Sequence, residues 1–82
     1  MSKLVNAEAT LELCRSILTQ RGQHSASQSI RGVELLTVSS ARLALAMLRQ
    51  TTVYGTIAGQ AKAVAIQALE DAVQSPEPYG VA

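Results

Sequence analysis

The sequence predicts an all-α protein: a small helical bundle or helical hairpin of two to three helices that is oligomeric. Apolar residues recur every three or four positions along three segments, the period of one helix face. Alanine, the strongest helix former, is frequent in the second half. The chain has no Phe and no Trp, so its core must be aliphatic. We expect a single helical domain over residues 1–82, with helices near 6–21, 29–50 and 56–74.

The first predicted helix covers residues 6–21. Asn6 is a favourable N-cap residue, and Gly22 is a favourable residue just beyond the C-terminus. Residues 22–29 are small and polar, which is typical of a loop. The apolar stripe of this helix consists of Leu4, Ala7, Leu11, Cys14 and Leu18, and Leu13 and Ile17 widen it.

The second predicted helix covers residues 29–50. Its segment 43–48 is apolar on almost every side, a pattern typical of a helix that is buried on more than one side. Residues 51–55 leave two interpretations open. The β-branched Thr51, Thr52 and Val53, followed by Gly55, favour a turn, whereas an uninterrupted helix would run on into the third segment.

The third predicted helix covers residues 56–74 and carries an alanine stripe. Alanine at successive positions of one face permits close approach of a second helix. Pro76 and Pro78 end regular structure, so we expect a flexible tail at 75–82. The stripe consists of Ala58, Ala61, Ala65, Ala68 and Ala72.

Composition argues against several functional classes. The net charge of +1 gives no strong attraction to nucleic acid, and no apolar run approaches the roughly 20 residues of a membrane span. One cysteine, Cys14, and one histidine, His24, do not form a disulfide framework or a zinc site. His24 lies in a predicted loop and Cys14 on an apolar stripe, so neither resembles a catalytic group. We expect a cytoplasmic protein without enzymatic activity, metal or cofactor.

Self-association is the primary functional hypothesis. A chain of this size buries only about 60–65% of its surface, and small scaffolds often compensate by oligomerising. The partner would then be another copy of the chain, in a closed oligomer or a polymer. The expected interface residues are Leu43, Met47, Ile57, Ala61, Val64 and Ala68.

The alternative hypothesis is a small adaptor or inhibitor, such as a phage-type or plasmid-type accessory protein, that binds another protein or an anionic ligand. Arg31, Arg42 and Arg49 lie nearly in line along the second predicted helix. Guanidinium groups in this arrangement would suit phosphates or an acidic partner. A solvated helix face is the other interpretation of the same pattern.

Residues 41–67 resemble a known family. Residues 41–52 read Ala-Arg-Leu-Ala-Leu-Ala-Met-Leu-Arg-Gln-Thr-Thr, and residues 63–67 read Ala-Val-Ala-Ile-Gln. With a one-residue gap, this is similar to the middle of the RebB-like (killing-trait) proteins, which form R-body ribbons. Lys62 stands where that family has asparagine, and the family's polar entry segment and glutamine stretch are missing. The resemblance implies a structural subunit of a protein polymer, without catalytic residues.

Overall fold

The computed structural model describes residues 3–30 and 38–74, which form four helices and, within these ranges, no strand. They are α1 (Lys3–Gln20), α2 (His24–Ser29), α3 (Val38–Gln50) and α4 (Thr56–Gln74). The all-α class predicted from the apolar periodicity is therefore confirmed.

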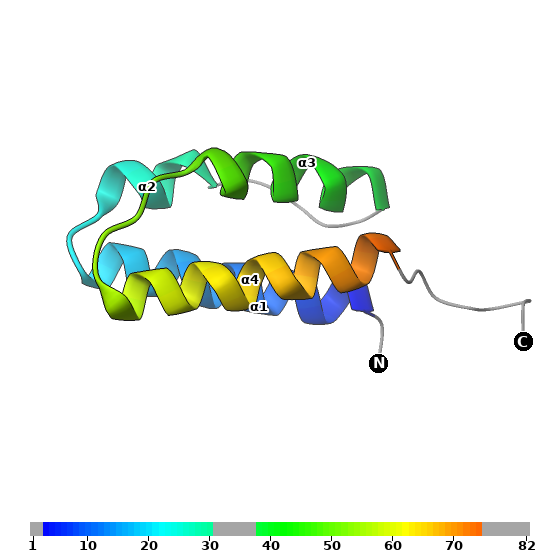
Figure 1. The fold of residues 1–82 in the computed structure, drawn as a ribbon, viewed down its shortest axis with the longest axis horizontal. Coiled ribbons are helices and arrows are strands. Elements are labelled where there is room, and N and C mark those ends of the chain that lie inside the picture. Colours follow the sequence, from blue (N-terminus) through cyan, green and yellow to red (C-terminus); the bar gives the residue numbers. More distant parts are fainter. Residues whose placement is uncertain (1–2, 31–37, 75–82) are drawn as a thin grey trace, which may run out of the picture.

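The helices are arranged in two layers. Figure 1 shows α1 and α4 side by side and antiparallel, with α2 and α3 above them and α3 antiparallel to α4. The most extensive packing joins α1 to α4, followed by α3 to α4, and α2 packs on α1. As a result, α2 and α3 cover one side of the α1–α4 pair, and no described element covers the other side.

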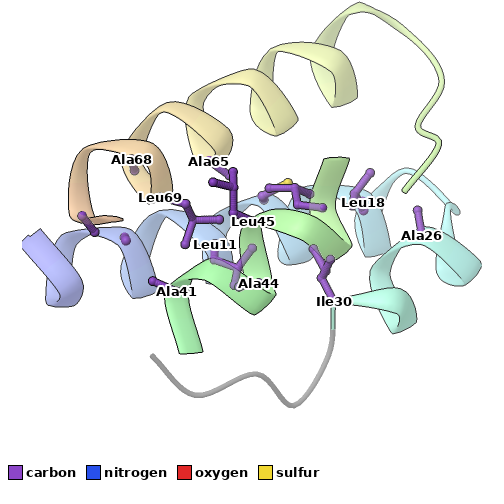
Figure 2. Close-up of a cluster of buried hydrophobic side chains, with 14 of the residues drawn as sticks. Leu11, Leu18, Ala26, Ile30, Ala41, Ala44, Leu45, Ala65, Ala68 and Leu69 are labelled. Carbon is purple, nitrogen blue, oxygen red and sulfur yellow. The ribbon is translucent and has the colours of Figure 1, made fainter. Parts of the chain in front are cut away.

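The core is aliphatic, as the lack of Phe and Trp requires. Figure 2 shows Leu11 of α1, Leu45 of α3 and Leu69 of α4 pointing toward one another. The largest fully buried side chains are Leu18, Ile30, Leu48, Leu69 and Cys14. Between them the helices meet through alanines, and those that are buried on α4 are Ala58, Ala65, Ala68 and Ala72. The alanine stripe is thus an intramolecular packing surface, with Ala61 half-buried at its edge.

Two predicted boundaries in the first part of the chain were wrong. The helix α1 already includes Lys3, so Asn6 lies inside it and accepts a hydrogen bond from Thr10 Oγ1 (2.8 Å). Residues 24–29 form α2 where a loop was predicted. Their composition is polar, but Ala26 and Ser27 are buried against α1, and the Ser27 and Thr19 hydroxyls share a hydrogen bond of 2.7 Å. This tertiary packing overrides the weak helix propensity of the segment.

The second predicted helix is confirmed from Val38 to Gln50. Its predicted beginning differs, because Ile30 is a buried turn residue that closes α2. Residues 31–37 and the predicted tail at 75–82 lie outside the described residues. The turn at 51–55 is confirmed and the uninterrupted helix is excluded, because α3 ends at Gln50 and Gly55 has a φ of +91°.

Within the described part of the chain, the apolar segment 43–48 is buried along one side. Ala44, Leu45 and Leu48 are buried, whereas Leu43 is 59% exposed and Ala46 is also exposed. The single chain therefore leaves part of this segment exposed, and burial of its outer side stays a prediction.

The C-terminus of α1 is closed by the glycine that the sequence suggested. The Gly22 amide donates to the Thr19 carbonyl (3.1 Å) and the Gln23 amide to the Leu18 carbonyl (2.8 Å). These two bonds form a Schellman motif, which needs a left-handed residue at Gly22, where φ is +77°.

Replacing Gly22 with alanine is expected to lower the free energy of unfolding by about 1 kcal/mol, because a Cβ is disfavoured at positive φ. Gly59 is the matched control. It lies inside α4, and, apart from its chain neighbours and the backbone of its own helix, no atom lies within 4 Å of where a Cβ would stand. Gly59→Ala should therefore raise the free energy of unfolding by about 0.5–1 kcal/mol. Urea denaturation followed by circular dichroism measures both, and equal effects of the two substitutions would contradict the prediction.

Candidate interaction site on the α1–α4 face

The uncovered side of the α1–α4 pair carries large apolar side chains. Leu13 of α1 is 60% exposed, and Ile57 and Val64 of α4 are 48% and 59% exposed. They border a groove of about 220 Å³ between the two helices. The groove is lined by Thr10, Leu13, Cys14, Ile17, Ile57, Gln60, Ala61 and Val64. We call this surface the α1–α4 groove.

Helix periodicity explains why these residues share one face. Residues three, four or seven apart lie on the same side of a helix, so Thr10, Leu13 and Ile17 form one wall. Ile57 and Val64 form the other wall in the same way. Arg15 and Thr19, which contact α2, lie on the far side of the buried stripe of α1. The groove therefore opens away from α2.

The lining of the α1–α4 groove is apolar and uncharged. Thr10 and Gln60 contribute its polar groups, and no Asp, Glu, Lys or Arg lines it. Cys14 lies at its inner side and is almost completely buried. Burial raises the pKa of the Cys14 thiol, and the nearby Lys62 offsets part of that rise. The neutral thiol then behaves as a small apolar group.

The structure separates the predicted interface residues into three places. Ile57, Ala61 and Val64 gather in the α1–α4 groove. Ala68 belongs to the buried core, whereas Leu43 and half-buried Met47 lie on α3, in the other layer. The sequence placed Leu13 and Ile17 on the apolar stripe of the first helix, which indicated that they could take part in packing. It did not indicate that they lie opposite Ile57 and Val64.

One of the three arginines predicted to contact an anion or a partner forms an ion pair within the chain. Arg49 of α3 binds Glu70 of α4 through a salt bridge. This contact also explains an acidic residue in the last part of α4, where the helix dipole disfavours it. Arg42 is exposed on α3. Arg31 lies outside the described residues. The charge of Arg49 is therefore already partnered within the chain.

A second cavity of about 500 Å³ lies where α2 meets the α3–α4 connection. Its lining contains no Lys, Arg, Asp or Glu, so it offers no obvious anion site apart from exposed His24. It is lined by Gly22, Gln23, His24, Ser25, Ala26, Ser29, Thr51, Thr52 and Tyr54.

Two side chains beside this cavity hold the connection in place. The Gln23 side-chain amide donates to the Tyr54 carbonyl (2.7 Å), and its Oε1 accepts from the Tyr54 amide (2.8 Å). Lys62 Nζ donates to the Thr51 carbonyl (2.6 Å) just after the end of α3. The Gln23 amide and the Lys62 ammonium group thus stabilise the connection between α3 and α4. Sequence reasoning did not identify these contacts, because their partners are main-chain atoms distant in sequence.

The fold and this surface define a small all-α protein with an uncharged apolar groove on one face. Comparisons with protein-family models, with characterised proteins and with solved structures found no match to the chain. None of the described helices combines the length and apolarity needed to cross a bilayer. Within residues 3–30 and 38–74, no three His, Cys, Asp or Glu side chains are grouped so that they could hold a metal ion.

Proposed function

We propose that this protein functions by self-association, without enzymatic activity, and that the α1–α4 groove is the contact surface. The observation that carries the proposal is the uncharged groove bordered by exposed Leu13, Ile57 and Val64. The resemblance of residues 41–67 to a family of polymer subunits agrees with self-association. The groove is a separate observation, because it rests on exposed apolar side chains of both α1 and α4 and not on the resemblance.

The groove is suited to a second copy because it has both ridges and a hollow. Branched aliphatic side chains project on either side, while Ala61 and Cys14 leave space between them. Burying a whole aliphatic side chain contributes about 1.5–3 kcal/mol. Leu13, Ile57 and Val64 are each about half exposed. Their complete burial would therefore contribute roughly 1 kcal/mol each, and twice that set in a symmetric pair.

The outer face of α3 is a weaker candidate for the same role. Leu43 is as exposed as Val64, but the exposed Arg42 directly precedes it in the sequence. Charged residues are depleted at the centres of interfaces. For this reason we place the contact on α1 and α4.

Val64→Asp tests the proposal, because it puts a charge into the groove at a position whose exposure leaves the fold intact. We expect the wild-type mass to rise with concentration in light scattering from about 1 to 500 µM, and the variant to remain a monomer. Leu43→Asp is the matched control, since Leu43 and Val64 are both 59% exposed. It should associate like the wild type.

Three results would contradict the proposal. A wild-type protein that is monomeric throughout the range would exclude self-association. Association lost in Leu43→Asp but kept in Val64→Asp would place the contact on α3. A Val64→Asp variant that associates like the wild type would remove the groove from the interface.

A further inference from the structure

We infer that the cavity between α2 and the α3–α4 connection binds a neutral mono- or disaccharide. The inference goes beyond the proposed function, because this cavity and the α1–α4 groove share no lining residue. The chemistry of the lining carries it: the lining is uncharged and rich in hydroxyl groups, and it includes an exposed tyrosine ring.

The cavity has the size of a small-molecule site. It lies at the end of the molecule where α2 approaches the connection that leads into α4 (Figure 1). Its volume of about 500 Å³ falls within the range of roughly 300–1,000 Å³ that is typical of ligand pockets. One wall comes from residues 22–29 and the other from residues 51–54. A ligand there would contact two segments that are distant in the sequence.

Hydroxyl groups make up most of the polar lining. Ser29 Oγ and Thr51 Oγ1 each donate to a main-chain carbonyl four residues earlier (3.0 and 2.8 Å), so their lone pairs remain able to accept a hydrogen bond. In the part of the chain that the structure describes, the hydroxyls of Ser25, Thr52 and Tyr54 bind no other group, so they can donate as well as accept. A sugar hydroxyl also both donates and accepts. The lining can therefore pair with several sugar hydroxyls at once.

Tyr54 supplies an aromatic ring beside these hydroxyl groups. The Gln23 side chain binds both the amide and the carbonyl of Tyr54 (2.8 and 2.7 Å), which fixes the main chain from which the ring projects. Tyr54 is 72% exposed, so its ring is accessible to a ligand in the cavity that it lines. A tyrosine ring combines an apolar face with a polar hydroxyl. A sugar ring has matching parts, because its C–H groups form an apolar face and its hydroxyls surround that face.

The same lining disfavours charged ligands and purely apolar ones. It contains no Lys or Arg to bind a phosphate or carboxylate, and no Asp or Glu to bind a cation. The imidazole of His24 is both a donor and an acceptor in its neutral form. An apolar ligand would cover the hydroxyl groups without giving them a hydrogen-bond partner, which opposes binding. A neutral ligand with many hydroxyl groups satisfies both restrictions.

An NMR titration of the whole isotope-labelled chain tests the inference. The probes are glucose, galactose, N-acetylglucosamine and maltose. At least one of them should shift the amide signals of residues 22–29 and 51–54, with a dissociation constant of about 1 mM.

Three variants test the roles of the side chains. Tyr54→Ala should weaken binding about tenfold, because the stacking surface is lost, whereas Tyr54→Phe keeps the ring and should weaken it by no more than about threefold. Thr52→Val removes one hydroxyl at nearly constant volume and should weaken binding about threefold. Ser16→Ala is the control. It removes an exposed hydroxyl of α1 outside the cavity and should leave binding unchanged.

Three results would overturn the inference. The first is the absence of shifts at residues 22–29 and 51–54 with all four sugars at about 50 mM. The second is unchanged binding in Tyr54→Ala. The third is tighter binding of glucose 6-phosphate than of glucose, which would indicate an anion site instead. Val64→Asp should bind sugar like the wild type, so this inference and the proposed self-association fail or succeed separately.

Discussion

Leu69→Ala is expected to lower the free energy of unfolding by about 2–5 kcal/mol, a large part of the roughly 4–12 kcal/mol available to a domain of this size. Leu69 is fully buried and lies at the junction of α1, α3 and α4, beside Leu11 and Leu45 (Figure 2). Its neighbours belong to three rigid helices, so they are poorly placed to collapse into the cavity that alanine leaves. Urea denaturation followed by circular dichroism gives the change.

Leu43→Ala is the control for the loss of a leucine side chain. Leu43 is 59% exposed on α3, so this substitution should lower the free energy of unfolding by less than about 1 kcal/mol. All variants must be compared at one protein concentration, because the proposed self-association would add to the apparent stability. Equal losses in Leu69→Ala and Leu43→Ala would mean that the three-helix junction is not the centre of the core.

Ala65→Leu is expected to have the second-largest effect, a loss of about 1–3 kcal/mol from overfilling. Ala65 is fully buried at the centre of the α4 stripe, where its small side chain allows close approach of the neighbouring helices. A leucine there must push helices apart or adopt an unfavourable rotamer. Thermal unfolding should show a fall in melting temperature of several degrees.

Ala63→Leu is the matched control, since Ala63 is exposed on the same helix two residues earlier. Leucine and alanine have similar helix propensities, so its free energy of unfolding should change by less than about 0.5 kcal/mol. If Ala65→Leu were tolerated equally well, alanine would be present in the stripe for helix propensity alone, and the packing interpretation would be wrong.

Local signals in the sequence predicted much of the fold. The three-and-four spacing of Ala7, Leu11, Cys14 and Leu18 identified the buried face of α1, and the alanine stripe identified that of α4. Gly22 ended α1 because a left-handed residue was needed there. These features depend on neighbours within one or two helical turns, which is the range over which periodicity and capping operate.

Features that depend on contacts distant in sequence were missed. The helix α2 is polar in sequence and is held by burial of Ala26 and Ser27 against α1. The interface residues were assigned by helix face alone, without knowing which helices are neighbours. Ala68 is buried in the core, whereas Val64, one helical turn earlier, is 59% exposed beside the groove. The apolar periodicity of one helix does not show which part of its surface a second helix covers.

The two hydrogen bonds between Gln23 and Tyr54 have a consequence for the thermodynamics of the proposed association. They join the residue that follows the α1 turn to the residue that precedes Gly55 and α4, and so limit how far α1 and α4 slide along each other. The two walls of the groove, one from each helix, are therefore held in register in the single chain. A partner that binds a surface already ordered loses less conformational entropy, so more of the free energy of apolar burial remains as affinity.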